Sequence, residues 1–327
     1  MKGFVDLQVN GYVGVDFSAP GLKLEGIRRV THALIERGTV AFCPTVITAR
    51  TEVYEQNLPV LAQAMGDPDL APHLLGIHLE GPFISPEDGA RGAHSRELTR
   101  LPDIELYKRL QELSANRITL VTLAPEQDGA VALIRYIVST GSVVSLGHHL
   151  GSGDDIARAC DAGATVVTHL GNGIPGYLPR HPNPIWHQLD EDRLMAMIIA
   201  DGHHLPESFA RIVHRVKTSG RLIVVSDSAP IAGLSPGSYT TLGQEVVLEQ
   251  TGRIWNPRDK HLVGSSACMI DCMNWLASIT SLSEAELWQV GHHNPLKLIG
   301  KQLDEGELAH LPDFRYEEGR FHKVMSC

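Results

Sequence analysis

Ionisable side chains end four of the short apolar runs in this sequence. Glu80 ends the run that begins at residue 74, and His148, His169 and Asp227 end three later runs. One carboxylate and two imidazoles suit a borderline divalent cation and leave one position for water. Asp227, on the opposite wall of the same mouth, could accept a proton from that water. These residue types therefore predict metal-assisted hydrolysis.

Each of these residues taken alone also has a structural interpretation. A single histidine at a strand end is more often a hydrogen-bonding core residue than a ligand, and Glu80 could be one half of a buried ion pair. Four ionisable residues at four strand ends, however, would cost several kcal/mol if they were buried unpaired. Their joint occurrence favours the metal site. No Gly-rich phosphate motif follows any of the runs, and the chemistry needs no serine or cysteine nucleophile.

The apolar runs alternate with helical patterns along most of the chain. They are rich in Val, Ile and Leu with little polar alternation, as expected for strands buried on both faces of a parallel sheet. Eight such runs favour an α/β fold of the (β/α)8 TIM-barrel type, whose active sites lie at the carboxyl ends of the strands. The predicted strands are residues 4–10, 39–45, 74–80, 117–123, 142–148, 164–169, 194–201 and 222–227, and the predicted helices are 22–37, 51–65, 104–114, 130–140, 154–162 and 207–218.

Two segments interrupt this alternation. Residues 82–102 are rich in Gly, Pro and charge and predict a long loop over the barrel mouth. Residues 229–262 predict a β-hairpin excursion, with turn chemistry at Thr251-Gly252. Helical patterns return at 266–279, at 284–291 and after Asn294-Pro295, and residues 311–327 predict a peripheral strand pair. We expect a barrel domain over residues 1–302 and a short tail over 303–327.

Other clusters of metal-binding residue types have simpler explanations. His203-His204 follows the seventh run and is expected to line the mouth of the barrel. His292-His293 precedes Asn294-Pro295 and is interpreted as a structural pair at a helix start. Cys268 and Cys272 have helical spacing, which core packing explains better than a metal site.

Composition excludes several classes of protein. The 28 Lys and Arg against 38 Asp and Glu give a net charge of −10, which argues against a nucleic-acid or anionic-membrane binder. No apolar run reaches the ~18 residues of a membrane span, and the first residues lack the apolar region of a signal peptide. Five scattered cysteines disfavour a disulfide scaffold. We therefore expect a cytoplasmic globular protein.

Several motifs share the order and spacing of one enzyme family. They are His78-Leu79-Glu80-Gly81-Pro82, Gly147-His148, Thr168-His169-Leu170-Gly171-Asn172, Ala200-Asp201-Gly202-His203-His204, Ser226-Asp227 and Gly264-Ser265-Ser266. From residue 3 to about residue 300 the chain resembles the N-acetylglucosamine-6-phosphate deacetylases of the amidohydrolase superfamily. The resemblance implies hydrolysis of N-acetylglucosamine 6-phosphate to glucosamine 6-phosphate and acetate. It also implies Glu80, His148 and His169 as metal ligands and Asp227 as the catalytic acid and base.

The end of the first run bears on the number of metal ions. Many members of the superfamily carry a His-x-His pair there for a second metal, whereas this chain has Gln8-Val9-Asn10. Because neutral amides bind zinc poorly, we expect one divalent metal per subunit. Zinc is the first expectation, and iron(II), cobalt and manganese also suit the ligand set.

The resemblance further implies which groups surround the substrate. His94, in the loop 82–102, corresponds to the electrophilic partner of the metal. The turn Asn172-Gly173 corresponds to backbone donors for the phosphate, and Arg180 to an arginine supplied by a neighbouring subunit, which implies a homodimer. The expected substrate contacts are Gln8, Asn10, Ala93, Asn172, Gly173, Arg180 and His204.

The chain also departs from the family pattern. Family members commonly have strands before the first barrel strand that build a flanking β-sandwich, so this sandwich is expected to be absent or vestigial here. The loop 173–187 is unusually rich in proline and could fit another N-acyl sugar, or one without a 6-phosphate. The alternatives are a deacylase for a different N-acyl sugar, another amidohydrolase reaction such as deamination or lactam opening, and a non-catalytic sugar-phosphate-binding barrel. The Glu-Gly-Pro strand end weighs against the second alternative, and retention of Asp227 weighs against the third.

Overall fold

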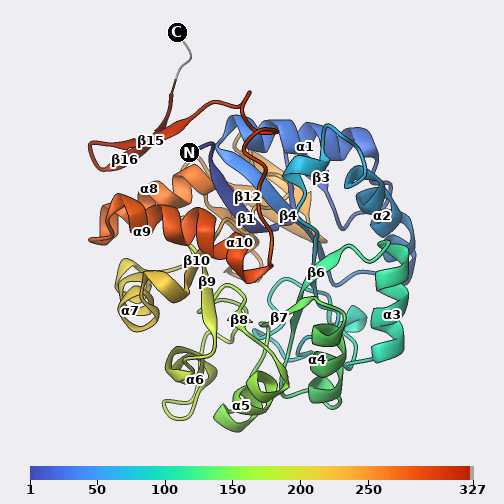
Figure 1. The fold of residues 1–327 in the computed structure, drawn as a ribbon. Helices are drawn as coiled ribbons and strands as arrows, with labels where there is room; N and C mark the ends of the chain where they lie inside the picture. Colours follow the sequence, from blue (N-terminus) through green and yellow to red (C-terminus); the bar gives the residue numbers. More distant parts are fainter. Residues whose placement is uncertain (325–327) are drawn as a thin grey trace.

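A sheet of eight parallel strands occupies the centre of the molecule, with helices around it (Figure 1). The computed structural model describes residues 1–324. The strands follow chain order around the sheet and each overlaps one predicted apolar run, so the predicted (β/α)8 barrel is confirmed. They are β1 (Phe4–Val9), β4 (Thr39–Ile47), β5 (Ile77–Glu80), β6 (Ile118–Leu123), β7 (Val143–Leu146), β8 (Val166–Val167), β9 (Met195–Ile199) and β10 (Leu222–Val225).

The helices on the outside of the barrel begin with capping residues where the sequence offers them. Asp103 accepts hydrogen bonds from two backbone N–H groups at the start of α3, and Ser152 and Asp155 form a capping box on α5. Helix α6 was not predicted, although Asn183 caps it and Pro184 is its first residue. The helices are α1 (Leu24–Glu36), α2 (Thr51–Ala64), α3 (Ile104–Leu113), α4 (Ala130–Ser139), α5 (Gly153–Ala162), α6 (Pro184–Asp190), α7 (Glu207–Lys217) and α8 (Met269–Ile279), with 3-10 turns at Ala71–His73, Arg96–Leu98 and Ser219–Arg221.

Strands β1 and β10 close the barrel with few backbone hydrogen bonds. They meet at a bridge between Val9 and Ser228, which follows β10, and there the Asn10 N–H donates to the Ser228 carbonyl over 2.9 Å. The buried Asp6 carboxylate accepts the backbone N–H groups of Gln8 and Ser226, each over 3.2 Å. A side chain thus takes the place of ladder bonds at this seam, and it fixes the ends of the strands that carry Gln8 and Asp227.

The barrel interior contains a polar layer below the strand ends. His78 Nε2 lies 2.7 Å from the Thr122 hydroxyl, which lies 2.7 Å from the Thr168 hydroxyl, and Ser145 also contacts Thr168. Burial lowers the pKa of His78 to about 4, so its ring is neutral. The layer satisfies its own hydrogen bonds and supports the residues above it.

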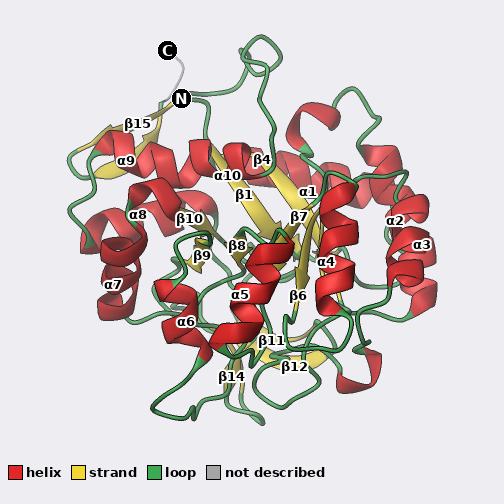
Figure 2. Ribbon diagram, turned by 60° about the horizontal axis from the view of Figure 1, so that its bottom comes forward, coloured by secondary structure: helices red, strands yellow, loops and turns green. Residues whose placement is uncertain are grey.

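The excursion after β10 is larger than the hairpin predicted for residues 229–262. It is a four-stranded antiparallel sheet, which we call the meander: β11 (Gly237–Thr241), β12 (Gln244–Leu248), β13 (Ile254–Asn256) and β14 (His261–Leu262). It lies at one end of the barrel (Figure 2). The first pair matches the predicted hairpin, and the turn chemistry at Thr251-Gly252 leads into a third strand. A second small sheet, β2 (Gly11–Tyr12) with β3 (Val15–Asp16), follows β1.

The histidine pair His292-His293 directly precedes a helix, as predicted, but it also forms the end of a π-helical turn. Helix α9 (Glu284–Trp288) continues through a π-helical turn (Gln289–His293) directly into α10 (Asn294–Leu298). The Asn294 amide donates to the carbonyls of Ser219 and Leu222, each over 2.7 Å, so Asn294 binds the first residue of β10 and the 3-10 turn before it. Within this turn the His292 ring lies 2.8 Å from the Gly3 carbonyl, so its role is structural.

The tail packs on the barrel end that holds the N-terminus. Strands β15 (Phe314–Glu317) and β16 (Arg320–Lys323) form the predicted strand pair, and the Phe314 N–H donates to the Met1 carbonyl over 2.7 Å (Figure 1). The Phe321 ring packs against Phe4 and Trp288, with centroids 4.9 Å away in both cases. The interpretation of residues 303–327 as a sandwich remnant stays a prediction, and residues 325–327, including Cys327, lie outside the described part of the chain.

Two observations bear on the environment of the protein. Cys43, Cys160, Cys268 and Cys272 are buried free thiols. Among residues 1–324, no helix combines the length and apolar character needed to cross a membrane.

We predict that Phe321→Ala lowers the free energy of unfolding by about 3–5 kcal/mol, because it leaves a cavity between Phe4 and Trp288. Urea denaturation followed by circular dichroism measures the change. His322→Ala, which alters an exposed neighbour on the same strand, serves as the control and should leave the midpoint nearly unchanged. Equal midpoints for the two variants would contradict the packing role of the tail.

Candidate metal centre and active-site pocket

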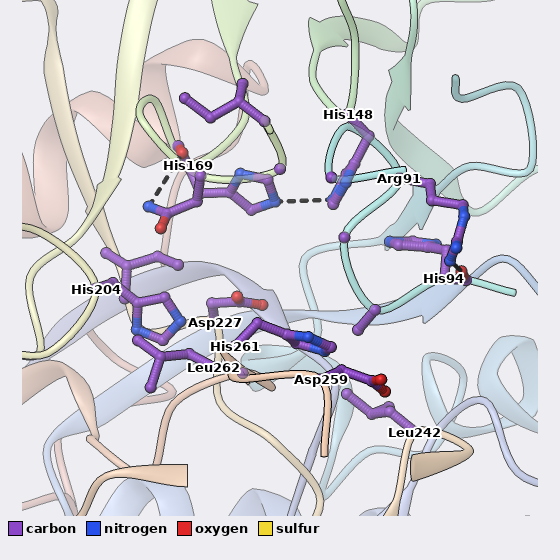
Figure 3. A pocket seen from close by; sticks show the side chains of 18 of the residues that line it. Arg91, His94, His148, His169, His204, Asp227, Leu242, Asp259, His261 and Leu262 are labelled. Carbon is purple, nitrogen blue, oxygen red and sulfur yellow. Dashed lines mark hydrogen bonds between the residues drawn. The ribbon is translucent and has the colours of Figure 1, made fainter. Parts of the chain in front are cut away.

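Glu80, His148 and His169 converge at the carboxyl ends of strands β5, β7 and β8, as the sequence predicted. One ligand atom from each lies within 4.8 Å of the others, and all three side chains are buried. Glu80 Oε1 lies 3.2 Å from His148 Nε2 and 3.0 Å from His169 Nε2, and the two imidazole nitrogens are 3.0 Å apart. Figure 3 shows the two rings directed toward each other. This is the candidate metal centre.

The hydrogen bonds of His148 show that this centre fits a cation. His148 Nδ1 lies 2.9 Å from the Ala90 carbonyl oxygen, which can only accept, so Nδ1 carries the proton. In the neutral ring, Nε2 then carries a lone pair, and this lone pair faces the Glu80 carboxylate and His169. A bound divalent metal would compensate the repulsion between these electron-rich groups, which otherwise lie unfavourably close to one another. The donor set therefore fits a divalent metal.

A shared backbone conformation directs the functional side chains into the barrel mouth. His148, His169 and Asp227 have φ values of 53°, 30° and 51°, and each stands two residues after the last residue of its strand. Non-glycine residues in this region cost about 1–3 kcal/mol each and persist only where surrounding structure enforces them. Their occurrence at three strand ends supports a functional interpretation of this rim.

The loop that contains Gly173 packs directly on the rings of His148 and His169. A Cβ on Gly173 would lie 2.7 Å from His148 Nδ1, and Gly173 has a φ of 61°. Any side chain there would collide with the imidazole and would require a strained backbone. Gly173 therefore allows the loop to cover the rings.

Strand β1 contributes two neutral amides to the site. Gln8 Nε2 donates to Glu80 Oε1 over 2.9 Å, and Asn10 Nδ2 donates to Asp227 Oδ1 over 2.7 Å. Asn10 lines the pocket, whereas Gln8 is fully buried beside Glu80 and is not among the lining residues. In this structure Gln8 contacts the candidate ligand Glu80, and its expected contact with substrate stays a prediction.

The two acidic residues of the site have different electrostatics. Burial opposes the charge of Glu80, but interactions with His148 and His169 lower the pKa of its carboxyl well below the usual value. Burial and the neighbouring Glu80 carboxylate raise the pKa of Asp227 to about 6. Asp227 can therefore both take and return a proton near neutral pH.

His94 lies beside the metal centre. Its Nδ1 is 2.9 Å from the Thr48 hydroxyl, and its ring centroid is 4.4 Å from that of His148. Burial and the nearby His148 lower the pKa of His94 to about 3, so the ring is neutral. A neutral ring with one nitrogen held by a hydroxyl can use the other nitrogen as a hydrogen-bond donor.

A pocket of about 820 Å³ opens from this centre and contains several of the expected substrate contacts. Ala93, Asn172, Gly173 and His204 line it. The Asn172 N–H already donates to the His169 carbonyl over 2.9 Å, so Gly173 offers the remaining backbone donor of that turn. His204 Nδ1 lies 2.7 Å from Asp201 Oδ2. Burial alone would raise the pKa of Asp201, but its contacts with His204 lower that pKa to about 2.

Arg180 lies outside this pocket. It is exposed on the loop before α6, near Tyr177, which is 98% exposed, and Trp186, whose ring N–H donates to the Arg180 carbonyl over 3.3 Å. Within one chain the guanidinium does not line the pocket.

The meander also contributes pocket walls that the sequence did not predict. Gln244, Asp259, Lys260 and His261 line the pocket, and Figure 3 shows Asp259 and His261 on the side opposite His148. The position of the meander after the eighth strand was the available signal, because the loops that follow barrel strands gather at the mouth. Arg91, in the loop 82–102, lines the pocket as well.

Comparisons with known proteins agree with this geometry. The amidohydrolase family matches residues 1–300. The N-acetylglucosamine-6-phosphate deacetylase of Homo sapiens is 35% identical over 318 residues, which cover 94% of this chain and 76% of that protein. The enzyme of the same name from Bacillus subtilis is 32% identical over 303 residues, covering 92% and 75%.

Solved structures give the same result. The N-acetyl-D-glucosamine-6-phosphate deacetylase of Mycobacterium smegmatis, in complex with N-acetyl-D-glucosamine-6-phosphate, superposes with a TM-score of 0.84 at 28% identity and covers 92% of this chain and 77% of that one. The Pasteurella multocida enzyme gives a TM-score of 0.82 at 29% identity, with coverage of 91% and 76%.

We predict that protein stripped with a chelator and titrated with Zn²⁺ or Co²⁺ in a calorimeter binds one ion per chain. Glu80→Gln should weaken this binding by more than about 100-fold, because removing a ligand costs more than removing an outer hydrogen bond. His203→Gln, at an exposed histidine near the mouth, is the matched control. Undiminished affinity in Glu80→Gln, or two equivalent ions per chain, would refute the assignment.

Proposed function

Because this chain belongs to the amidohydrolase family, and within it to the N-acetylglucosamine-6-phosphate deacetylases, we propose that it hydrolyses the acetyl amide of N-acetylglucosamine 6-phosphate. The products are glucosamine 6-phosphate and acetate. The observation that carries this proposal is the convergence of Glu80, His148 and His169 in one pocket with Asp227. The curated relatives support the substrate, since their names specify it.

Glu80, His148 and His169 would hold one divalent ion, with zinc as the first choice and iron(II), cobalt and manganese as alternatives. When bound, such an ion supplies Lewis-acid chemistry, polarising the acyl carbonyl and lowering the pKa of a water molecule. Gln8 keeps the Glu80 carboxylate oriented through its hydrogen bond to Oε1. The amides of Gln8 and Asn10 are poor metal ligands, which supports a single ion.

Asp227 moves the protons of the reaction. Asn10 holds one carboxylate oxygen over 2.7 Å, and the other has no hydrogen-bond partner among residues 1–324. With a pKa of about 6 the group is mostly ionised at neutral pH, so it accepts the proton of the attacking water. It then delivers that proton to the amine nitrogen of the sugar as the C–N bond breaks. One carboxylate therefore serves both steps.

His94 stabilises the acyl oxygen as charge develops there. His94 acts as a donor in the tautomer in which the Thr48 hydroxyl donates to Nδ1 over 2.9 Å and Nε2 carries the proton. The ring is neutral, because burial and His148 lower the pKa of His94 to about 3. A fixed neutral donor beside the metal centre acts as an oxyanion-hole group.

The remaining pocket residues would bind the sugar phosphate. Gly173, His204, Ala93 and Asn172 all line the pocket, and we assign the Gly173 N–H and His204 to the phosphate and the sugar. We assign Arg180 to the phosphate of the substrate that is bound in the neighbouring subunit, so the enzyme would be a homodimer. The exposure of Tyr177, on the same loop, and of Trp186, in the following helix α6, supports this assignment, since exposed aromatic residues are typical of interface anchors. Four buried free thiols favour a cytoplasmic location.

We predict that the protein releases acetate from N-acetylglucosamine 6-phosphate and prefers this substrate to the unphosphorylated sugar. The reaction should stop when a chelator removes the metal. Asp227→Asn should lower kcat about 100- to 10,000-fold, because it removes the general base and acid. Asp190→Asn, the same charge change at an exposed site, should have little effect. Chelator-insensitive turnover would refute the metal mechanism, and preference for the unphosphorylated sugar would remove Arg180 from its role.

Mixed dimers test the contribution of Arg180 from the partner. We expect Arg180→Ala and Asp227→Asn to be nearly inactive alone, and their mixture to regain activity, because one of the two sites in a heterodimer then carries both intact residues. The activity of mixed and separately incubated proteins is compared at equal total concentration. Failure of the mixture to regain activity would contradict sharing of the site.

A further inference from the structure

Gln244, on β12 of the meander, makes hydrogen bonds to two elements at once. Its Oε1 lies 2.7 Å from Asn256 Nδ2 and 2.9 Å from His261 Nε2, both in the meander. Its Nε2 lies 3.2 Å from the carbonyl oxygen of Ala93, in the loop 82–102. The contact with Ala93 joins residues that are 151 positions apart, and Ala93 is the residue directly before His94.

The orientation of the Gln244 amide follows from its neighbours. Asn256 Oδ1 accepts the backbone N–H groups of Arg258 and Asp259, over 2.9 and 3.1 Å, so the Asn256 amide nitrogen must be the atom that faces Gln244. That nitrogen only donates, and Gln244 therefore presents its oxygen to it. Gln244 Nε2 is left facing Ala93, whose carbonyl only accepts. The contact with Ala93 is a hydrogen bond of defined direction.

This hydrogen bond completes the fixation of His94. Arg91 holds both sides of the His94 backbone, because its carbonyl accepts the His94 N–H over 3.1 Å and its guanidinium donates to the His94 carbonyl over 2.9 Å. Arg91 lies in the same loop, so these bonds do not anchor the loop to the rest of the protein. Bonds to the barrel hold the loop farther from His94, as at the Ala90 carbonyl beside His148. Nearest to the ring, Thr48 contacts His94 itself and Gln244 holds the preceding carbonyl.

Anchoring matters for this loop in particular. Among residues 82–102 the regular structure consists of a single 3-10 turn, Arg96–Leu98. A loop of this kind samples many conformations unless side chains hold it. A displacement of about 1 Å in a catalytic group can reduce the rate about 100-fold.

We propose that Gln244 is a positioning residue for His94. Its amide holds the Ala93 carbonyl, and the Ala93–His94 peptide in turn sets the position from which the His94 ring donates to the acyl oxygen. The meander is then a structural part of the catalytic site as well as a wall of the pocket. This inference rests on the role proposed for His94.

Two substitutions of Gln244 test the proposal. Gln244→Leu keeps the approximate size but removes both the Nε2 donor and the Oε1 acceptor of Gln244. Gln244→Glu keeps an acceptor for Asn256 and His261 and replaces only the donor, with an oxygen that repels the Ala93 carbonyl. We expect kcat to fall about 10- to 100-fold in both variants, while KM changes less than about 3-fold and one metal ion per chain still binds, because no metal ligand or phosphate contact is altered. Gln250→Leu and Gln250→Glu, at an exposed glutamine that follows the same strand, are the matched controls and should keep the original kcat.

A double-mutant cycle with His94→Ala separates positioning from a general structural effect. If Gln244 acts only through His94, Gln244→Leu costs nothing further in the His94→Ala background. Multiplicative losses of kcat overturn the role of Gln244 but leave that of His94 intact. If His94→Ala itself keeps full kcat, the proposed role of His94 fails, and that of Gln244 with it.

Discussion

The buried carboxylate of Glu80, facing two imidazole nitrogens, is the interaction on which the rest of the site depends. All three side chains are buried, and His148 is held with its lone pair toward Glu80 by the Ala90 carbonyl. Such an arrangement is stable only when positive charge compensates it. Surrounding features serve this requirement: Gln8 donates to the carboxylate, and Gly173 brings a loop close enough to cover the rings.

The barrel supplies the rigidity that this arrangement needs. Left-handed backbone at His148, His169 and Asp227 raises the energy of the folded state, and short parallel strands with apolar neighbours on both faces hold these residues in place. The polar layer around His78 lies below the strand ends and is internally hydrogen-bonded. Stability and chemistry are thus divided along the barrel axis, with packing below and conformational strain at the rim.

The sequence predicts what depends on local pattern and fails where distant segments meet. The ends of parallel strands share one edge, so Glu80, His148, His169 and Asp227 could be brought together from run boundaries alone. Helix α6 was missed because a Pro-rich stretch looks like a loop until Asn183 is seen as a cap. The roles of Gln244 and Gln8 could not be predicted, because each depends on a contact with a residue 72 or more positions away.

The seam between β1 and β10 ties the order of assembly to the site. Asp6 and Ser226 are 220 positions apart, and Asn10 and Asp227 are 217 positions apart. Closure of the barrel is therefore among the most non-local events in the folding of this chain. The entropic cost of such a closure is offset only by the contacts that the final strand makes when it docks. During synthesis, β5, β7 and β8 emerge with their imidazoles and carboxylate before Asp227 exists. The Asp227 carboxylate, to which we assign the proton transfer, therefore joins the centre only with the last strand, and a chain stalled before that point lacks it.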